Sequence, residues 1–265
     1  MDTVINGESL IQLINNHNPN LLLIDVRSFS DYNKGHIPGS INMDLMNFHW
    51  LDTSKEGIVQ FNKQMKIMLN YLGVSSQSFI VFYDDISGSS ASRGIWLLHY
   101  FSHKDVFILD GGFENWLKSN HPIETKTNPF MSSESKFNMN NEVLADAEYI
   151  KNKIEKNSND VVIIDCRSEL EYNGIVARAS RRGHIPNAVN IDWIDNLENE
   201  KFKDFEKLSQ RYSFISKDKE IITYCQGGYR AANTYLVLKK LGYSNVKMYL
   251  GSWGEWGNIP TLPIE

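Results

Sequence analysis

Four sequence blocks occur twice along the 265-residue chain, in the same order. The blocks, each given with its second copy, are 21–27 and 161–167, 35–42 and 183–190, 79–83 and 220–224, and 109–116 and 249–256. Repetition in a constant order indicates that one domain is present twice. Three pairs are offset by 140 or 141 residues and one by 148, which places an eight-residue insertion within residues 174–182.

Each copy alternates short apolar runs with helix-like segments. The runs lie at 21–24, 79–83, 106–109, 161–164, 221–224 and 246–250. Continuous runs of this kind suit strands of a parallel sheet that is buried on both faces. Helices are expected at 91–101 and 230–241. The pattern predicts an α/β fold of two tandem domains, each a mostly parallel sheet with helices on both faces.

The expected boundaries follow from the repeat and from a polar stretch between its copies. We assign residues 1–122 to the first domain and residues 141–265 to the second. Residues 123–140 are rich in serine, glutamate and asparagine, which is typical of a linker.

Composition excludes several classes of function. The net charge is −5 and there is no long basic run, so nucleic acid is not an expected partner. A membrane span needs roughly 20 apolar residues, far more than any run here, so no membrane association is expected. The N-terminus lacks the basic start and apolar stretch of a secretory signal, which makes the cytoplasm the expected location. Two cysteines without a CxxC pair predict neither a disulfide scaffold nor a metal site.

The most informative segment follows the apolar run 221–224. Cys225 begins a loop, Cys-Gln-Gly-Gly-Tyr-Arg, that ends where a helix is expected near Arg230. In an open parallel sheet the ligand crevice lies at the carboxyl ends of the strands. Loop N–H groups and the positive end of the helix favour a thiolate there. Gly227 and Gly228 allow left-handed backbone that curls these N–H groups into an anion-binding nest.

The two cysteines call for different interpretations. Cys225 could be a small buried residue at a strand end, but its polar, glycine-rich surroundings favour a reactive thiol in a partly exposed, electropositive loop. Cys166 replaces Val26 of the first copy, which favours a role in core packing.

The doubled Asp-Val/Cys-Arg, Gly-His-Ile-Pro and tryptophan blocks, with one cysteine loop after the third block, resemble the tandem-domain rhodaneses. These include the thiosulfate and 3-mercaptopyruvate sulfurtransferases. The resemblance extends over about residues 11–259 and implies a first domain without a catalytic cysteine. Asp84 stands at the position of Cys225 in the first copy, and a carboxylate cannot form a persulfide. The first half is therefore expected to be catalytically silent.

The resemblance also implies site residues. Cys225 would be catalytic, and the remaining loop residues would bind substrate; these are Gln226, Gly227, Gly228, Tyr229 and Arg230. Arg178 and Arg182 lie in the insertion, where family members place substrate-contacting residues. Together with Arg181 they could equally form a solvated face.

The resemblance favours a thiosulfate-type enzyme. Mercaptopyruvate enzymes typically carry Cys-Gly-Ser-Gly-Val in the loop and a substrate-binding arginine shortly after the Asp-x-Arg block, where this chain has Glu171. The loop Cys225–Arg230 is closer to bacterial thiosulfate-type enzymes, which begin with Cys-Gln and end with a basic residue. 3-Mercaptopyruvate remains the alternative donor.

Other repeated residues are expected to be structural, because the silent half keeps them. They are Asp25 and Arg27, Asp165 and Arg167, and His36 and His184. The tryptophans of the last block, Trp253 and Trp256, are expected in the core and between the domains.

The expected reaction is double displacement without a cofactor or a metal. Cys225 would take the outer sulfur of thiosulfate as a persulfide and pass it to cyanide, a thiol or a sulfur-carrier protein. We expect the chain to be a monomer. A phosphatase or arsenate reductase is a rival, but those loops have Cys-x5-Arg, whereas Ala231 stands at that position here. The second rival is a non-enzymatic binding module.

Overall fold

The computed structural model describes residues 3–156 and 158–265, and its first half contains a five-stranded parallel sheet. The strand order is β1-β5-β4-β2-β3. These strands are β1 (Val4–Ile5), β2 (Leu21–Asp25), β3 (Ile41–Asn42), β4 (Phe79–Tyr83) and β5 (Val106–Leu109). The helices are α1 (Gly7–Asn15), α2 (Phe29–Lys34), α3 (Lys55–Tyr71), α4 (Ser89–Tyr100) and α5 (Gly112–Lys118), with a 3₁₀ helix η1 (Leu45–Phe48).

The second half repeats this sheet as β6-β12-β11-β7-β8, again parallel throughout. Its strands are β6 (Leu144–Ala145), β7 (Val161–Asp165), β8 (Val189–Asn190), β11 (Glu220–Tyr224) and β12 (Val246–Tyr249). The helices are α6 (Ala147–Glu155), α7 (Glu169–Tyr172), α8 (Phe205–Arg211), α9 (Tyr229–Lys240) and α10 (Ser252–Trp256), with 3₁₀ helices η2 (Asn141–Val143) and η3 (Trp193–Asn196). The identical strand order confirms the predicted fold class. A two-stranded hairpin of β9 (Leu197–Glu198) and β10 (Lys201–Phe202) was not predicted, because two-residue strands have no readable pattern.

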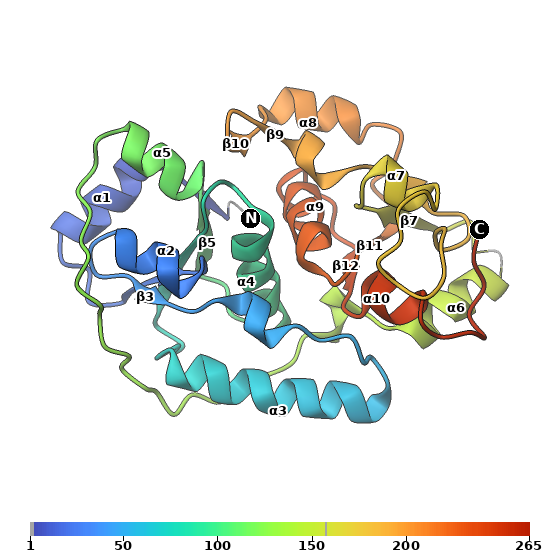
Figure 1. Cartoon of the computed structure of the whole chain (residues 1–265), viewed down its shortest axis with the longest axis horizontal. Coiled ribbons are helices and arrows are strands. Elements are labelled where there is room, and N and C mark those ends of the chain that lie inside the picture. Colours follow the sequence, from blue (N-terminus) through green and yellow to red (C-terminus); the bar gives the residue numbers. More distant parts are fainter. Residues whose placement is uncertain (1–2, 157) are drawn as a thin grey trace.

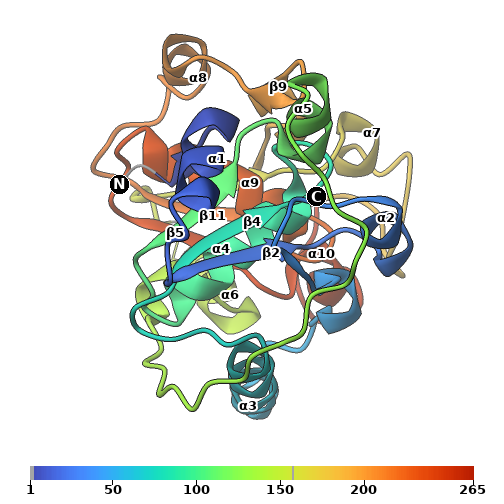
Figure 2. The same ribbon diagram turned by 90° about the vertical axis from the view of Figure 1, so that its left-hand side faces the viewer.

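Helices cover both faces of each sheet. In the first half, α1 and α5 pack on the outer face, whereas α3 and α4 pack on the face that looks toward the second half. Alternate residues of each strand divide between these two layers, as Val81 and Phe82 do. Figure 2 brings the first half to the front and shows the long helix α3 at one end of the molecule.

The two halves share one apolar core. Helices α4 and α9 lie side by side between the two sheets and make the largest contact between elements of different halves (Figure 1). The shared core extends from Phe82 and Trp96 of the first half to Leu236 and Met248 of the second. Each of these two helices follows the loop at the end of its central strand, so their packing brings the two loops near each other.

A buried ion pair recurs in each half, as the repeat predicts. The Arg27 guanidinium donates to Asp25 Oδ2 at 2.6 Å and to the Gly35 carbonyl at 2.8 Å. Arg167 makes the same contacts with Asp165 and Gly183, at the same two distances. Each pair ties the end of a strand to the following Gly-His-Ile-Pro turn.

The repeated histidines lie in these turns. His36 Nδ1 is 2.8 Å from the Tyr32 carbonyl and its ring stacks on Tyr32 at 3.7 Å. His184 makes the same two contacts with Tyr172. These arrangements agree with the predicted structural role.

Residues 123–140 contain no helix or strand, and Glu124 forms an isolated antiparallel bridge with His36; the linker and the domain boundaries stay a prediction. Within the described parts of the chain, every helix falls short of the length and apolarity that a membrane crossing requires.

Candidate active site

Cys225 lies immediately after β11, at the carboxyl end of the second sheet. Its Sγ accepts a hydrogen bond from the Gly228 N–H at 3.2 Å. The Ser252 hydroxyl accepts the Cys225 N–H at 3.2 Å, and the Cys225 carbonyl accepts the Trp253 N–H at 2.9 Å. The start of α10 therefore holds the backbone of Cys225, while the loop itself supplies a donor to the sulfur.

The two loop glycines have different roles. Gly228 has φ +84°, the left-handed conformation that turns its N–H toward the sulfur. Gly227 does not have a positive φ, so the predicted left-handed backbone is confirmed at Gly228 alone. Instead, a Cβ on Gly227 would lie 1.9 Å from His49 Cε1. Gly227 therefore gives room to a histidine ring that comes from the first half.

Cys225 is less accessible than expected, with 1% of its surface exposed. The sequence predicted a partly exposed thiol, because the loop is polar. Residues of the first half pack against the loop around it. The Tyr229 hydroxyl donates to the Leu45 carbonyl at 2.6 Å, and the His49 ring stacks on Tyr229 at 5.8 Å.

Arg230 is paired with a carboxylate at the edge of the loop. Its Nη1 and Nη2 donate to the two oxygens of Glu171 at 2.6 and 2.9 Å. Burial by itself would raise the pKa of Glu171, but the hydrogen bonds and charge of Arg230 outweigh burial and lower the pKa to about 2. The same pairing raises the pKa of Arg230. The charge of Arg230, which is expected to bind substrate, is thus balanced by Glu171.

The three arginines of the insertion separate in the structure. Arg181 donates to carbonyls of the C-terminal segment, including Trp256 at 2.7 Å and Leu262 at 2.7 Å, and is structural. Arg178 is exposed, and its carbonyl accepts the Gln226 side-chain amide at 3.2 Å. Arg182 is also exposed. Arg178 therefore lies beside the cysteine loop, and its contact with substrate stays a prediction, as does that of Arg182.

The first half contributes an arginine that the sequence analysis did not single out. Arg93, on α4, is buried, and a Cβ on Gly228 would lie 3.0 Å from its Nη1. Burial lowers the pKa of Arg93 to about 10, although electrostatic interactions with Tyr229 and Cys225 act to raise it. Burial and the charge of Arg93 also lower the pKa of His49. The sequence did contain a signal for Arg93, because this residue follows the first-half segment that corresponds to the cysteine loop.

The silent loop holds its own carboxylate in a nest of N–H groups. Asp84 accepts hydrogen bonds from the backbone N–H groups of Gly88 at 3.0 Å and of Ser90 and Ala91 at 3.1 Å. Burial raises the pKa of Asp84 to about 6, although these bonds favour the ionised form. A fixed carboxylate therefore occupies the position that a transferable sulfur would need.

Cys166 is fully buried and its thiol donates weakly to the Ile164 carbonyl at 3.8 Å. Burial raises the pKa of the Cys166 thiol well above its usual value. These contacts agree with the predicted packing role.

Removing the carboxylate of Glu171 is expected to destabilise the protein in a pH-dependent way. Its pKa is lowered in the folded state, so its contribution is full above the unfolded pKa near 4.5 and is lost as the pH falls toward 2. Wild type and Glu171→Gln should differ by about 3 kcal/mol in the free energy of unfolding at pH 7. Urea titrations between pH 7 and pH 3 measure this difference.

The exposed pair of Glu198 and Lys207 gives a matched control. Glu198→Gln should leave the free energy of unfolding unchanged within error at every pH. A difference in the free energy of unfolding between wild type and Glu171→Gln that does not shrink as the pH falls would contradict the lowered pKa of Glu171.

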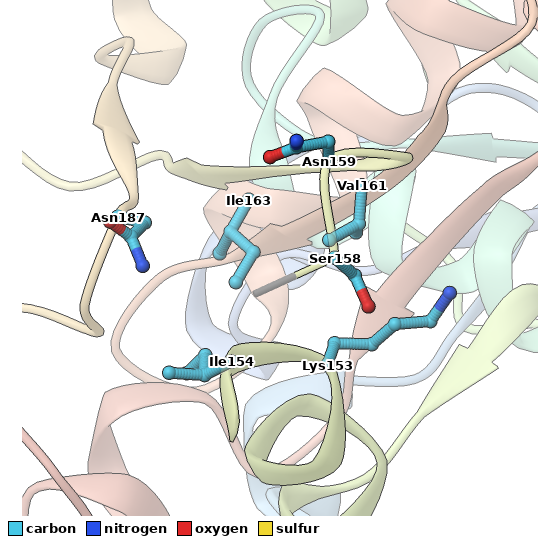
Figure 3. Close-up of a pocket in the computed structure, with 7 residues that line it drawn as sticks. All are labelled: Lys153, Ile154, Ser158, Asn159, Val161, Ile163 and Asn187. Carbon is cyan, nitrogen blue, oxygen red and sulfur yellow. The ribbon is translucent and has the colours of Figure 1, made fainter. Parts of the chain in front are cut away.

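A pocket of about 530 Å³ lies elsewhere in the second half (Figure 3). It is lined by Lys153, Ile154, Ser158, Asn159, Val161, Ile163 and Asn187. Val161 begins β7 and pairs with the first residue of β11, so this pocket lies at the amino ends of the strands. It is on the opposite edge of the sheet from Cys225.

A model of the rhodanese-like domain matches residues 7–119 and 146–259. The chain belongs to the rhodanese-like family. This confirms the resemblance drawn from the repeated blocks and the cysteine loop.

Several sulfur-transfer proteins match this chain over most of their length. A thiosulfate sulfurtransferase of Pseudomonas aeruginosa is 32% identical over 93% of this chain and 92% of its own. A sulfur carrier protein, TtuD, of Thermus thermophilus is 31% identical over 88% and 86%. A 3-mercaptopyruvate sulfurtransferase of Escherichia coli is 29% identical over 93% and 92%.

The fold also matches solved structures. An EanB variant with a cysteine persulfide and ergothioneine superimposes with a TM-score of 0.85 and 21% identity, over 99% of this chain and 70% of that one. At this identity the match concerns the fold.

Proposed function

We propose that this rhodanese-like protein is a sulfurtransferase that carries sulfane sulfur as a persulfide on Cys225. The observation that carries the proposal is the placement of Cys225. Its sulfur lies at the carboxyl end of β11 and accepts the Gly228 N–H, in the half of the chain that has the thiol. The full-length similarity to thiosulfate and 3-mercaptopyruvate sulfurtransferases supports the same chemistry.

The reaction has two displacement steps. The Cys225 thiolate attacks the outer sulfur of thiosulfate, the bond between the two sulfur atoms breaks, and sulfite leaves with the electron pair. An acceptor, cyanide or a thiolate, then attacks the outer sulfur of the persulfide and regenerates the Cys225 thiolate. Splitting the transfer in this way predicts ping-pong kinetics. The Gly228 N–H is a preorganised donor toward the sulfur in both steps.

Thiosulfate is the donor that the site favours. Glu171 stands where the related mercaptopyruvate enzymes are expected to have an arginine, and its carboxylate occupies both Nη atoms of Arg230. A donor with a carboxylate would therefore lack the arginine that is expected to pair with it in those enzymes. Arg178 lies beside the loop through its carbonyl, and its exposed guanidinium, with Nε 3.9 Å from Glu171 Oε1, can attract a small dianion to the loop.

For the sulfur acceptor, we propose a class of molecule. A small thiol or a sulfur-carrier protein would take the sulfur, in keeping with the sulfur carrier protein among the relatives. The cytoplasmic location and the monomeric state remain predictions.

Intact mass tests the proposal. Incubation with thiosulfate should add one sulfur atom to the protein, and cyanide should remove it as thiocyanate. 3-Mercaptopyruvate should load the protein more slowly at equal concentration. Faster loading by 3-mercaptopyruvate would reverse the donor assignment. Loading by neither donor would contradict the sulfurtransferase proposal and favour a binding module.

A further inference from the structure

The silent first half places a buried positive charge against the cysteine loop. Arg93 is 4% exposed and lies on α4, whose N-terminal end follows the silent loop. A Cβ on Gly228 would lie 3.0 Å from Arg93 Nη1 and 3.1 Å from the Leu250 carbonyl. The guanidinium therefore contacts the residue whose N–H donates to Cys225 Sγ.

Arg93 differs from the other buried arginines in its partners. Arg27 and Arg167 each pair with an aspartate of their own strand at 2.6 Å. Within the described residues, the hydrogen-bond and cation–π partners of the Arg93 guanidinium are Met248 Sδ at 4.0 Å and the rings of Trp96 and Tyr229. None of these groups carries a negative charge at neutral pH.

A buried cation without an anion is costly in free energy. The groups that interact favourably with the charge of Arg93 are Tyr229 and Cys225. Tyr229 is neutral at pH 7, because burial raises the pKa of its hydroxyl above the ordinary value. Cys225, whose Sγ accepts the N–H of the Gly228 that Arg93 packs against, is therefore the nearby group that can supply a negative charge.

We infer that Arg93 is the countercharge that holds the sulfur of Cys225 as an anion. Arg93 acts on the thiolate before a donor arrives. Its action on the persulfide afterwards rests on the proposed function. The silent half thus supplies part of the electrostatics of the site, in addition to covering it. This explains why a half without a thiol keeps its loop and helix against the active loop.

The test measures alkylation of Cys225 by iodoacetamide at pH 7, in a Cys166→Val background so that a single thiol is present. Iodoacetamide is neutral and reacts with the thiolate, so its rate reports the anion without any sulfur donor. Arg93→Met should slow alkylation at least tenfold, and Arg93→Lys should restore most of the rate. Arg27→Met removes a buried cation of the same half that is paired with Asp25. It should leave the rate within about twofold of its parent, because sites without shared partners act independently.

A second pair of variants keeps Arg93 in place, in case its removal prevents folding. Met248→Glu would put a carboxylate beside the guanidinium, whereas Met248→Gln has the same shape without the charge. Met248→Glu should slow alkylation relative to Met248→Gln. Equal rates in these two variants would overturn the inference.

Two outcomes separate this inference from the proposed function. Slow alkylation of Arg93→Met in a protein that accepts no sulfur would support the countercharge and reject the transfer. A raised KM for thiosulfate with unchanged alkylation would show that Arg93 binds the donor, which would overturn the inference and leave the transfer intact.

Discussion

Cys225→Ser is expected to abolish sulfur loading and transfer completely. A serine hydroxyl cannot form a persulfide, and every other contact of the loop would remain. The expected result is no mass gain after incubation with thiosulfate and no thiocyanate above the uncatalysed rate. Enzymes that lose their nucleophile can keep residual activity through the groups around it. In this site those groups act on the sulfur that the nucleophile carries, so no residual activity is expected.

The other cysteine gives the matched control. Cys166→Val copies the residue at the equivalent position of the first half, Val26, and both positions are buried. This variant should load sulfur at a rate close to wild type, because a swap between small apolar residues costs about 1 kcal/mol or less when volumes match. Sulfur on the Cys225→Ser protein, mapped to Cys166 by peptide mass, would refute the assignment.

Gly228→Ala is expected to reduce kcat/KM on the order of 100-fold, since displacement of a catalytic contact by about 1 Å can have that effect. Gly228 has φ +84°, where a side chain is strained, and its Cβ would press on Arg93 and on the Leu250 carbonyl. Both neighbours are buried, so the loop has to move. The movement would take the Gly228 N–H away from Cys225 Sγ.

Gly242 is a control with the same backbone. It also has φ +84°, but a Cβ there would have no atom within 4 Å. Gly242→Ala should cost about 1 kcal/mol of unfolding free energy through the left-handed backbone, and should leave kcat/KM unchanged. Steady-state rates together with thermal unfolding of both variants separate loop displacement from backbone strain. Equal activities of the two variants would contradict the role of the Gly228 N–H.

Much of the fold could be predicted because its signals are local or repeated. The helix expected at 230–241 is α9 at Tyr229–Lys240, and the one expected at 91–101 is α4 at Ser89–Tyr100. The strand that precedes Cys225 and the glycine that turns toward its sulfur are neighbours in the chain. Conformational preferences of strands, helices and glycine act over a few residues, so a linear pattern can show them.

The closure of the site could not be predicted in this way. The polar loop indicated a partly exposed thiol, yet Cys225 is buried, and the Tyr229 hydroxyl of its loop reaches the Leu45 carbonyl, 184 residues away. Arg230 was expected to bind substrate, but it pairs with Glu171, 59 residues earlier. Such contacts have no signature in composition or spacing.

By itself, the sequence determined the duplicated α/β fold, and it predicts a silent first half and Cys225 as the sulfur carrier. These depend on the order of the blocks and on the presence of a thiol at Cys225 but not at Asp84. Only the tertiary structure decided which charges surround that thiol. The packing of α4 against α9 brings Arg93 to the loop without an anionic partner of its own. Electrostatic interactions depend on distance and burial in space, and neither can be read from positions along the chain.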